Sequence, residues 1–388
     1  MFKSDDIIAP MPRPIYLDYN GTTPHDPEAI DAMRPFLETE FGNPSSSHYY
    51  GIAPRRAVEA AREQVAGILA CRPDEILFTS GGTEANNHAI KSVARLYKER
   101  GRHIITSRVE HPAVLNVCRF LEFEGFDVTY LPVDETGRVN VFDLEAAIRP
   151  DTILISIMHA NNEVGTIQPI REITRIAEQK GIMVHTDAAQ SVGKMATDVN
   201  DLGVSLLSMA GHKVYAPKGI GALYIRRGLE LEPFCHGAGQ ENGRRAGTEN
   251  VLEIVGLGKA CEVALRHMDN APRQMAGLRD RLQEGLTGAI ENVRVNGHPE
   301  HRLPNTLSIS FYGLEANRML EEIGLEVAAS AGAACHSDTV EISHVLVAMG
   351  LEEQWGKGTL RFSVGRMTTK EEIDHAMAVV IKAVKRLQ

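Results

Sequence analysis

Three segments of the 388-residue chain combine small residues with a side chain that could do chemistry. Ser80-Gly81-Gly82-Thr83 follows an apolar run and opens a helical pattern, so its backbone N–H groups and the Thr83 hydroxyl could bind an anion. Asp187 follows the apolar run 182–186, where open α/β sheets bind their ligands. Lys213, in Gly-His-Lys, could act as an amine nucleophile if its surroundings lower its pKa. Taken singly, these segments fit a glycine turn, a helix cap and a solvated lysine equally well.

Three further side chains could take part in catalysis or binding. Cys335 lies in a loop of small residues, and the adjacent His336 could favour its thiolate. His111 could stack on an aromatic ring, and Arg361 could bind a carboxylate. A single cysteine is more often inert, a single histidine more often structural, and a single arginine more often a surface ion-pair partner.

The elements that must position these residues follow an alternating pattern. Between residues 60 and 230, short β-branched runs alternate with helical patterns, which predicts an α/β fold with a mostly parallel sheet flanked by helices. After residue 250, a long helix over 253–290 precedes further strands and a final helix over 370–387. We therefore predict a large α/β domain over 16–258 and a smaller α+β domain from 1–15 and 259–388. The strands predicted for the large domain are 75–79, 103–107, 127–131, 152–158, 183–186, 206–208 and 221–225.

Composition limits the possible functions. The chain has 41 Lys and Arg against 51 Asp and Glu, a net charge of −10, which disfavours a general nucleic-acid or membrane-surface binder. The apolar run 153–158 is too short to span a membrane, and the first residues lack the apolar run of a signal peptide. The five cysteines form no CxxC pair, so we expect no disulfide framework and no metal site, and a cytoplasmic location.

The order of the candidate residues is more specific than any one of them. An anion site, a stacking histidine, a strand-end carboxylate and a His-Lys pair follow one another along the chain. Enzymes that use pyridoxal 5′-phosphate (PLP) have this order, because the cofactor needs a cradle for its phosphate, a carboxylate at its pyridine nitrogen and a lysine for its aldehyde.

The chain resembles the cysteine desulfurases and selenocysteine lyases of the class V aminotransferase superfamily, which are fold-type I PLP enzymes. The resemblance runs from Tyr16 to Thr369, nearly the whole chain. The motifs that carry it are, in order, GGTEANN, EHPAV, NNEVG, HTDAAQ, GHKVYAPKGIGALY, RRAGTEN and GAACHSD.

The resemblance implies how residues would hold the cofactor ring. Lys213 would bond covalently to PLP and act as a base, and Asp187 would pair with the pyridine nitrogen. His111 would stack on the ring and carry protons. Gln190 and Asn162 would bond the side of the ring that carries the phenolate oxygen.

The resemblance also assigns the phosphate and the substrate carboxylate. Gly82, Thr83 and His212 would bind the phosphate. Thr248 would reach the phosphate of the neighbouring subunit, which implies a homodimer, and Arg361 would anchor the substrate carboxylate. Ala210 replaces a serine that often precedes Gly-His-Lys, so one phosphate hydrogen bond is expected to be missing or supplied otherwise.

Cys335 would be the nucleophile of a cysteine desulfurase, which converts L-cysteine to L-alanine and passes the sulfur, held as a persulfide, to a protein acceptor. A selenocysteine lyase acting on L-selenocysteine stays open. The motif Ala-Ala-Cys-His-Ser-Asp is closer to such lyases, whereas Pro112 stands where animal lyases carry an acid. An aminotransferase or another PLP lyase is a further alternative, against which the cysteine loop argues, and so is a nucleotide-binding module that uses the Gly82 turn.

Overall fold

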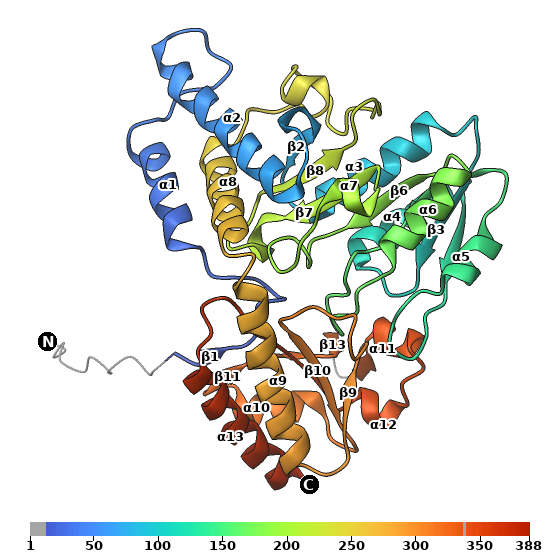
Figure 1. The fold of residues 1–388 in the computed structure, drawn as a ribbon, viewed down its shortest axis with the longest axis vertical. Coiled ribbons are helices and arrows are strands. Elements are labelled where there is room, and N and C mark those ends of the chain that lie inside the picture. Colours follow the sequence, from blue (N-terminus) through green and yellow to red (C-terminus); the bar gives the residue numbers. More distant parts are fainter. Residues whose placement is uncertain (1–12, 337–338) are drawn as a thin grey trace, which may run out of the picture.

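The structure, a computed structural model, describes residues 13–336 and 339–388, without the side chains of 333–341. Separate hydrophobic clusters organise two units. Those on the two faces of the larger sheet belong to a large unit, blue to yellow in Figure 1, and another belongs to a small unit, mostly orange and red. The predicted α/β fold class is confirmed.

The large domain is built on a seven-stranded sheet with the order β2-β8-β7-β6-β5-β3-β4. Strand β8 runs antiparallel to both of its neighbours, and the other pairs are parallel. Each predicted strand overlaps an observed one. The strands are β2 (Ile76–Thr79), β3 (His103–Ser107), β4 (Asp127–Leu131), β5 (Thr152–Ser156), β6 (Met183–Asp187), β7 (Leu206–Ala210) and β8 (Gly221–Ile225).

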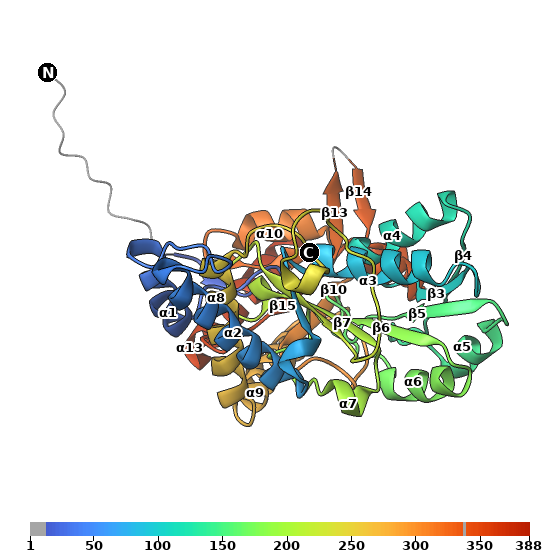
Figure 2. The same ribbon diagram turned by 90° about the horizontal axis from the view of Figure 1, so that it is seen from above.

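Successive residues of these strands face opposite sides of the sheet, and helices cover both sides. Leu77 and Ile104 pack under α3 and α4, whereas Ile76 and Ile105 belong to the core of the opposite face. Figure 2 shows α3 and α4 on one side of the sheet and α5, α6 and α7 on the other. The helices of this domain are α1 (Pro27–Glu38), α2 (Tyr49–Leu69), α3 (Gly82–Leu96), α4 (Pro112–Phe123), α5 (Val141–Ala147), α6 (Ile170–Gln179), α7 (Val199–Leu202) and α8 (Val251–Arg266).

The small domain has an antiparallel sheet with the order β12-β15-β10-β9, against which α9, α10 and α13 pack. Strand β1 (Ile15–Tyr16) pairs with β11, which joins the start of the described chain to this domain. The remaining elements are α9 (Ala271–Ala289), β9 (Val293–Asn296), β10 (Thr306–Phe311), α10 (Ala316–Ile323), β11 (Val327–Ala328), β12 (Ser330–Ala331), β13 (Ala333–His336), β14 (Thr339–Ile342), α11 (His344–Ala348), α12 (Glu353–Gly356), β15 (Thr359–Ser363) and α13 (Lys370–Leu387).

The stretch over 253–290 is helical as predicted, but a turn divides it into two helices, α8 and α9. Pro272 lies in the first turn of α9, and a proline there has no N–H with which to continue a preceding helix. Leu257 of α8 is buried in the large core, whereas Ala271 of α9 is buried in the small one. The predicted boundary after residue 258 therefore falls inside α8, and the domains meet in the turn that follows this helix.

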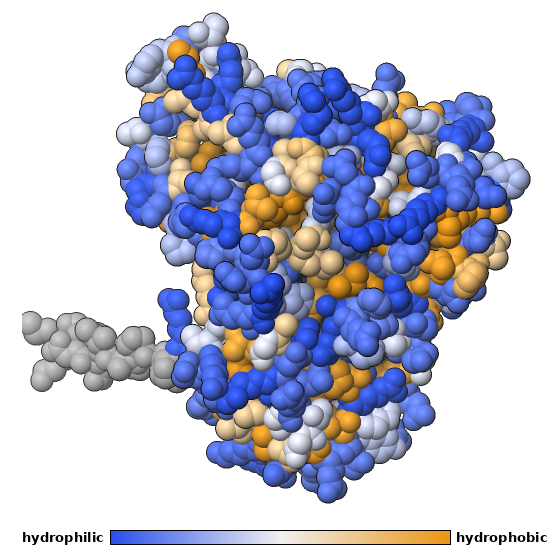
Figure 3. Space-filling model, viewed as in Figure 1, coloured by the Kyte–Doolittle hydropathy of each residue, from blue (hydrophilic) through white to orange (hydrophobic). Residues whose placement is uncertain are grey.

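Hydrophilic residues cover most of the face shown in Figure 3, with hydrophobic residues in patches between them. Across the described ranges, no helix combines the length and the apolar character that crossing a bilayer requires.

Candidate active site

A cavity of about 320 Å³ opens where the parallel strands of the large sheet end and the small domain begins. The segments after β2, β3, β5, β6 and β7 line it, and β15 of the small domain contributes one residue. These are the carboxyl ends of the strands, where open α/β sheets bind ligands. The residues singled out from the sequence that line the cavity are Gly82, Thr83, His111, Asn162, Asp187, Gln190, His212, Lys213 and Arg361.

Asp187 ends β6 and is held from two sides. Its Oδ2 accepts a hydrogen bond from Nδ2 of Asn86 at 2.7 Å, and its Oδ1 accepts one from the backbone N–H of Ala189 at 2.9 Å. The second bond closes a turn, not the helix cap that remained an alternative. With only 6% of its surface exposed, Asp187 presents a carboxylate of fixed orientation to the cavity.

Lys213 ends the short turn Gly211–Lys213 after β7. Its Nζ donates to the backbone oxygens of Asn20 at 2.5 Å and Gly21 at 2.6 Å. Burial lowers the pKa of Lys213 to about 8, and the charge of Arg361 acts in the same direction. A lower pKa leaves more uncharged amine near neutral pH, as a nucleophilic lysine requires.

The end of the cavity near α3 can bind an anion. Gly81 caps this helix with a φ of 147°, a conformation open to glycine and strained for other residues. The unpaired N–H groups of the helix N-terminus and the Thr83 side chain therefore lie at the cavity wall. His212 lies beside them, and its Nδ1 is 3.2 Å from the Thr22 hydroxyl. Burial lowers the pKa of His212 to about 4, so its ring is neutral at pH 7.

His111 caps α4, and its Nδ1 accepts a hydrogen bond from the backbone N–H of Ala113 at 3.1 Å. The neutral ring therefore carries its proton on Nε2. Partial desolvation lowers the pKa of His111. The preceding Glu110 is fully buried, which raises its pKa to about 8, and it accepts hydrogen bonds from the Ser107 hydroxyl and the Met158 N–H.

Arg361 comes from β15 and links the two domains. Its Nη2 donates to Asp18 Oδ1 at 2.6 Å and to the Ser330 hydroxyl at 3.0 Å, and its Nη1 donates to the Asn162 carbonyl at 3.0 Å. These bonds fix a guanidinium at the cavity wall, where it can bind a carboxylate.

Cys335 lies in β13, and the structure describes its backbone but not its side chain. Where the sequence predicted a loop, β13 and β14 pair as antiparallel strands. After β14, the Ser343 hydroxyl donates to the Glu163 carboxylate, and His344 Nε2 lies 2.9 Å from the Glu110 carbonyl oxygen. Both contacts fall beside cavity residues, because Glu163 follows Asn162 and Glu110 precedes His111.

Thr248 lies outside the cavity, exposed in the segment between β8 and α8. Its predicted contact is with the phosphate of a neighbouring subunit, and an outward position is compatible with that contact.

Sequence reasoning missed several residues that build the site. Asn86 lies in the GGTEANN motif, four residues after Gly82, where one turn of helix brings both to the same side. Asn20 and Asp18 come from the segment Tyr16-Leu-Asp-Tyr-Asn, at the N-terminal end of the resemblance. Their partners are distant in sequence, so spacing gave no signal.

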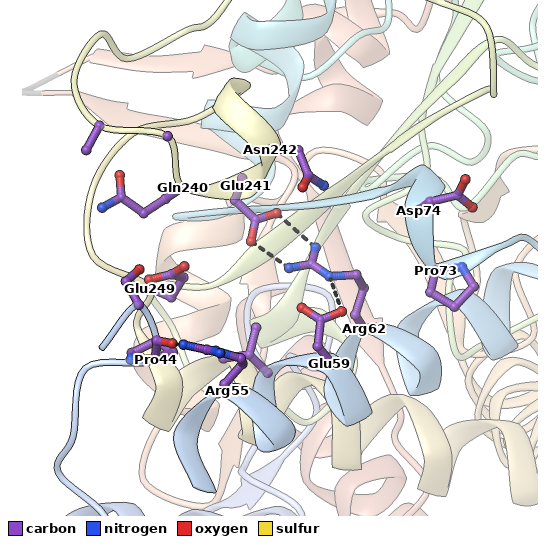
Figure 4. A pocket seen from close by; sticks show the side chains of 14 residues that line it. Pro44, Arg55, Glu59, Arg62, Pro73, Asp74, Gln240, Glu241, Asn242 and Glu249 are labelled. Atoms are coloured by element: carbon purple, nitrogen blue, oxygen red, sulfur yellow. Dashed lines mark hydrogen bonds and ion pairs between the residues drawn. The ribbon is translucent and has the colours of Figure 1, made fainter. Parts of the chain in front are cut away.

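A larger cavity, of about 660 Å³, lies on the large domain, and none of the predicted residues line it (Figure 4). At its wall, Arg62 donates two hydrogen bonds to the carboxylate of Glu241, at 2.7 Å and 2.9 Å. Glu241 also accepts from the Phe78 N–H of β2. The ion pair between Arg62 and Glu241, with the hydrogen bond from Phe78, therefore holds the segment after β8 against the sheet.

The model of the aminotransferase class-V family matches residues 15–376 of the chain. A protein of Dictyoglomus turgidum named cysteine desulfurase IscS is 49% identical over 97% of this chain and 96% of its own. The human protein named cysteine desulfurase is 47% identical over 98% of this chain and 84% of its own.

The comparison with solved structures also finds proteins similar to this chain over most of its length. A NifS-like protein superposes with a TM-score of 0.91 at 39% identity, covering 97% of this chain and all of its own (100%). A structure titled SspA in complex with cysteine gives a TM-score of 0.80 at 40% identity, over 91% of this chain and 99% of its own. The chain therefore belongs to the cysteine desulfurase family of class-V aminotransferases, whose members are PLP-dependent enzymes.

Proposed function

We propose that the protein is a homodimeric, cytoplasmic cysteine desulfurase that uses PLP, releases L-alanine from L-cysteine and carries the sulfur as a persulfide on Cys335 to a protein acceptor. The observation that carries the proposal is the meeting of Asp187, Lys213 and Arg361 at one cavity, next to the base of the strand pair that holds Cys335. The cysteine in the SspA complex supports the choice of substrate.

The residues of the cavity fit PLP. The N-terminus of α3, with Thr83 and His212, suits a phosphate, and Asp187 suits a protonated ring nitrogen. The buried Oδ1 of Asn86 has no hydrogen-bond partner among the described residues, which is expected of a wall that meets a polar ligand. When bound, PLP supplies an electron sink for the substrate.

Each residue then has a task that follows from its surroundings. Asp187 would keep a proton on the ring nitrogen of bound PLP, because its fixed carboxylate favours the charged form. Lys213 Nζ moves a proton at the substrate α-carbon, for which a pKa of about 8 is well matched. Arg361 binds the substrate carboxylate and so orients its side chain.

Cys335 performs the sulfur transfer. Its thiolate attacks the substrate Sγ, a new S–S bond forms, and the bond between Sγ and Cβ breaks. The electron pair of that bond stays on Cβ, which takes up a proton, so the products are L-alanine and a persulfide on Cys335. The two reactants supply all the atoms and electrons, and no external oxidant is needed.

The homodimer rests on Thr248, whose exposed position leaves it free to contact a second copy. The cytoplasmic location rests on the cysteines with described side chains, Cys71, Cys118, Cys235 and Cys261, all of which are free thiols.

The test is to purify the protein with PLP and supply L-cysteine or L-selenocysteine in separate assays. We expect a visible absorbance band, L-alanine from L-cysteine and sulfur bound to the protein. Alanine from L-selenocysteine alone would make the protein a selenocysteine lyase. A protein with neither a visible band nor alanine production would contradict both functions.

A further inference from the structure

Lys194 is a buried lysine that the chemistry above does not use. It is 5% exposed and does not line the cavity. Its Nζ donates to Gln190 Oε1 at 2.6 Å and to Asn20 Oδ1 at 3.0 Å. Both acceptors are neutral, and no carboxylate among the side chains that the structure describes forms an ion pair with Lys194.

These contacts match an uncharged amine. An amine has two N–H groups, and Lys194 has two acceptors for them. Burial lowers the pKa of Lys194 well below its ordinary value, and the charges of Lys213 and Arg361 act in the same direction. A charged ammonium would bring a third N–H and an unbalanced charge into a buried site, which is costly.

The two bonds of the Gln190 amide set its orientation. Its Oε1 accepts from Lys194, and its Nε2 donates to the backbone oxygen of Asn20 at 3.1 Å. If the amide turned over, Oε1 would face the Asn20 carbonyl oxygen, and two acceptors would oppose each other. The Asn20 carbonyl oxygen also accepts a hydrogen bond from Lys213 Nζ, so both of its neighbours here, Gln190 Nε2 and Lys213 Nζ, are donors. Gln190 lines the cavity, and its Nε2 retains a second N–H.

We propose that Lys194 is a positioning residue, which holds the Gln190 amide so that its N–H group, and not its oxygen, serves the cofactor. The inference rests on the proposed function and on the expectation, implied by the family resemblance, that Gln190 would donate to the phenolate oxygen of PLP. A donor at that oxygen would draw negative charge away from the protonated nitrogen that would link PLP to Lys213. That nitrogen would then hold its proton less tightly, so its pKa would be lower.

The test is a pH titration of the visible band of the PLP-loaded protein. Lys194→Met leaves an unbranched apolar side chain, one atom shorter than lysine, and removes both donors. We expect the apparent pKa of the band to rise by about half a unit to one unit. Gln190→Met should raise it similarly, and the double variant should add nothing further, because both changes remove the same donor. The other titratable and charged groups at the cavity stay in place: Asp187, Lys213, His111, His212, and Arg361 with Asp18.

Asn305→Leu is the matched control. Asn305 Nδ2 donates at 3.0 Å to the same Asn20 Oδ1 that Lys194 contacts, but the hydrogen bonds of the Gln190 amide go to Asn20 and Lys194 and not to Asn305. We expect its titration to follow the wild type. An equal shift in Asn305→Leu, or additive shifts in the double variant, would overturn the proposal.

Two further outcomes separate this inference from the proposed function. A wild-type protein without a visible band would contradict the function itself. A wild-type band with an unchanged titration in Lys194→Met would contradict only the role of Lys194. If Lys194→Met does not fold, Lys194→Gln carries the same test, because its side chain is one bond shorter and falls short of Gln190.

Discussion

The two sides of the cavity are built differently. On the large-domain side, Asp187, Lys213 and Gln190 each make two hydrogen bonds that fix them at the carboxyl ends of strands. The small domain contributes Arg361 and the strand pair of Cys335, and the segment after that pair contacts the large domain. Cofactor chemistry is therefore expected to depend on the first side, and substrate binding and sulfur transfer on the second. Changes on the two sides should have separable effects.

The largest effect should come from Lys213→Ala on the large-domain side. Loss of the amine removes both the covalent link to PLP and the base, so turnover of L-cysteine should fall by a factor on the order of a thousand or more. The fold should persist, because no carboxylate loses an ion-pair partner. Steady-state alanine production measures the loss, and the exposed Lys180→Ala serves as control. Turnover within tenfold of the wild type would show that the cofactor chemistry on the large-domain side does not depend on the Lys213 amine.

Arg361→Gln tests the other side. It removes the charge that would bind the substrate carboxylate, so the KM for L-cysteine should rise by about 10- to 100-fold, with a smaller change in kcat. The visible band of bound PLP should remain. Arg294→Gln, at an exposed position of β9 in the same sheet, should match the wild type in both respects. Loss of the visible band in Arg361→Gln would contradict the claim that cofactor binding depends only on the large-domain side.

The rate of PLP capture should depend on pH through Lys213. Its pKa of about 8 means that protonation blocks the amine at lower pH. The reactive fraction therefore rises about tenfold between pH 7 and pH 9. His212, with a pKa of about 4, does not titrate in this range. Stopped-flow absorbance after mixing PLP with cofactor-free protein measures the rate.

Arg361→Gln provides a second test of the pH dependence. Arg361 lowers the pKa of Lys213, so its removal should raise that pKa and move the rate profile to higher pH. A wild-type rate that is flat or falls between pH 7 and pH 9 would contradict the assignment of Lys213.

The smallest effect should come from Ser343→Ala at the base of the Cys335 strand pair. The Ser343 hydroxyl caps α11 and donates to Glu163, so its loss should lower the free energy of unfolding by about 1 kcal/mol. Persulfide formation should slow a few-fold, whereas PLP capture should keep its wild-type rate. Ser343→Thr retains the hydroxyl and should behave as the wild type. Slower PLP capture in Ser343→Ala would show that the two sides are coupled.

Much of this arrangement could be predicted from local sequence. Short β-branched runs between helical patterns located the strands of the large sheet, and the amphipathic pattern of 370–387 matches α13. The residues at strand ends converge because parallel strands all present their carboxyl ends to one edge. The break between α8 and α9 was not predicted, although Pro272 in the first turn of α9 is a local signal for it.

The supporting contacts could not be predicted in the same way. Asn20 joins the backbone of the large domain to the small one through Asn305 and Thr306, and Lys194, only four residues after Gln190, also donates to the distant Asn20. These contacts depend on tertiary packing, and asparagine or lysine in a polar motif gives no sign of burial. The supporting role of such residues is recognised only in the folded structure, where the two domains lie side by side.

The central claim is that Cys335 carries the sulfur. It is tested most directly by reacting the PLP-loaded protein with L-cysteine, alkylating it and measuring the masses of its cysteine peptides. We expect the peptide of Cys335 to gain one sulfur atom, and the peptides of the other cysteines to stay unmodified. Cys335→Ala should retain the visible band but form no alanine, whereas Cys235→Ala, another free thiol, should react as the wild type. Alanine formation at the wild-type rate in Cys335→Ala, or sulfur on a different cysteine, would contradict the account.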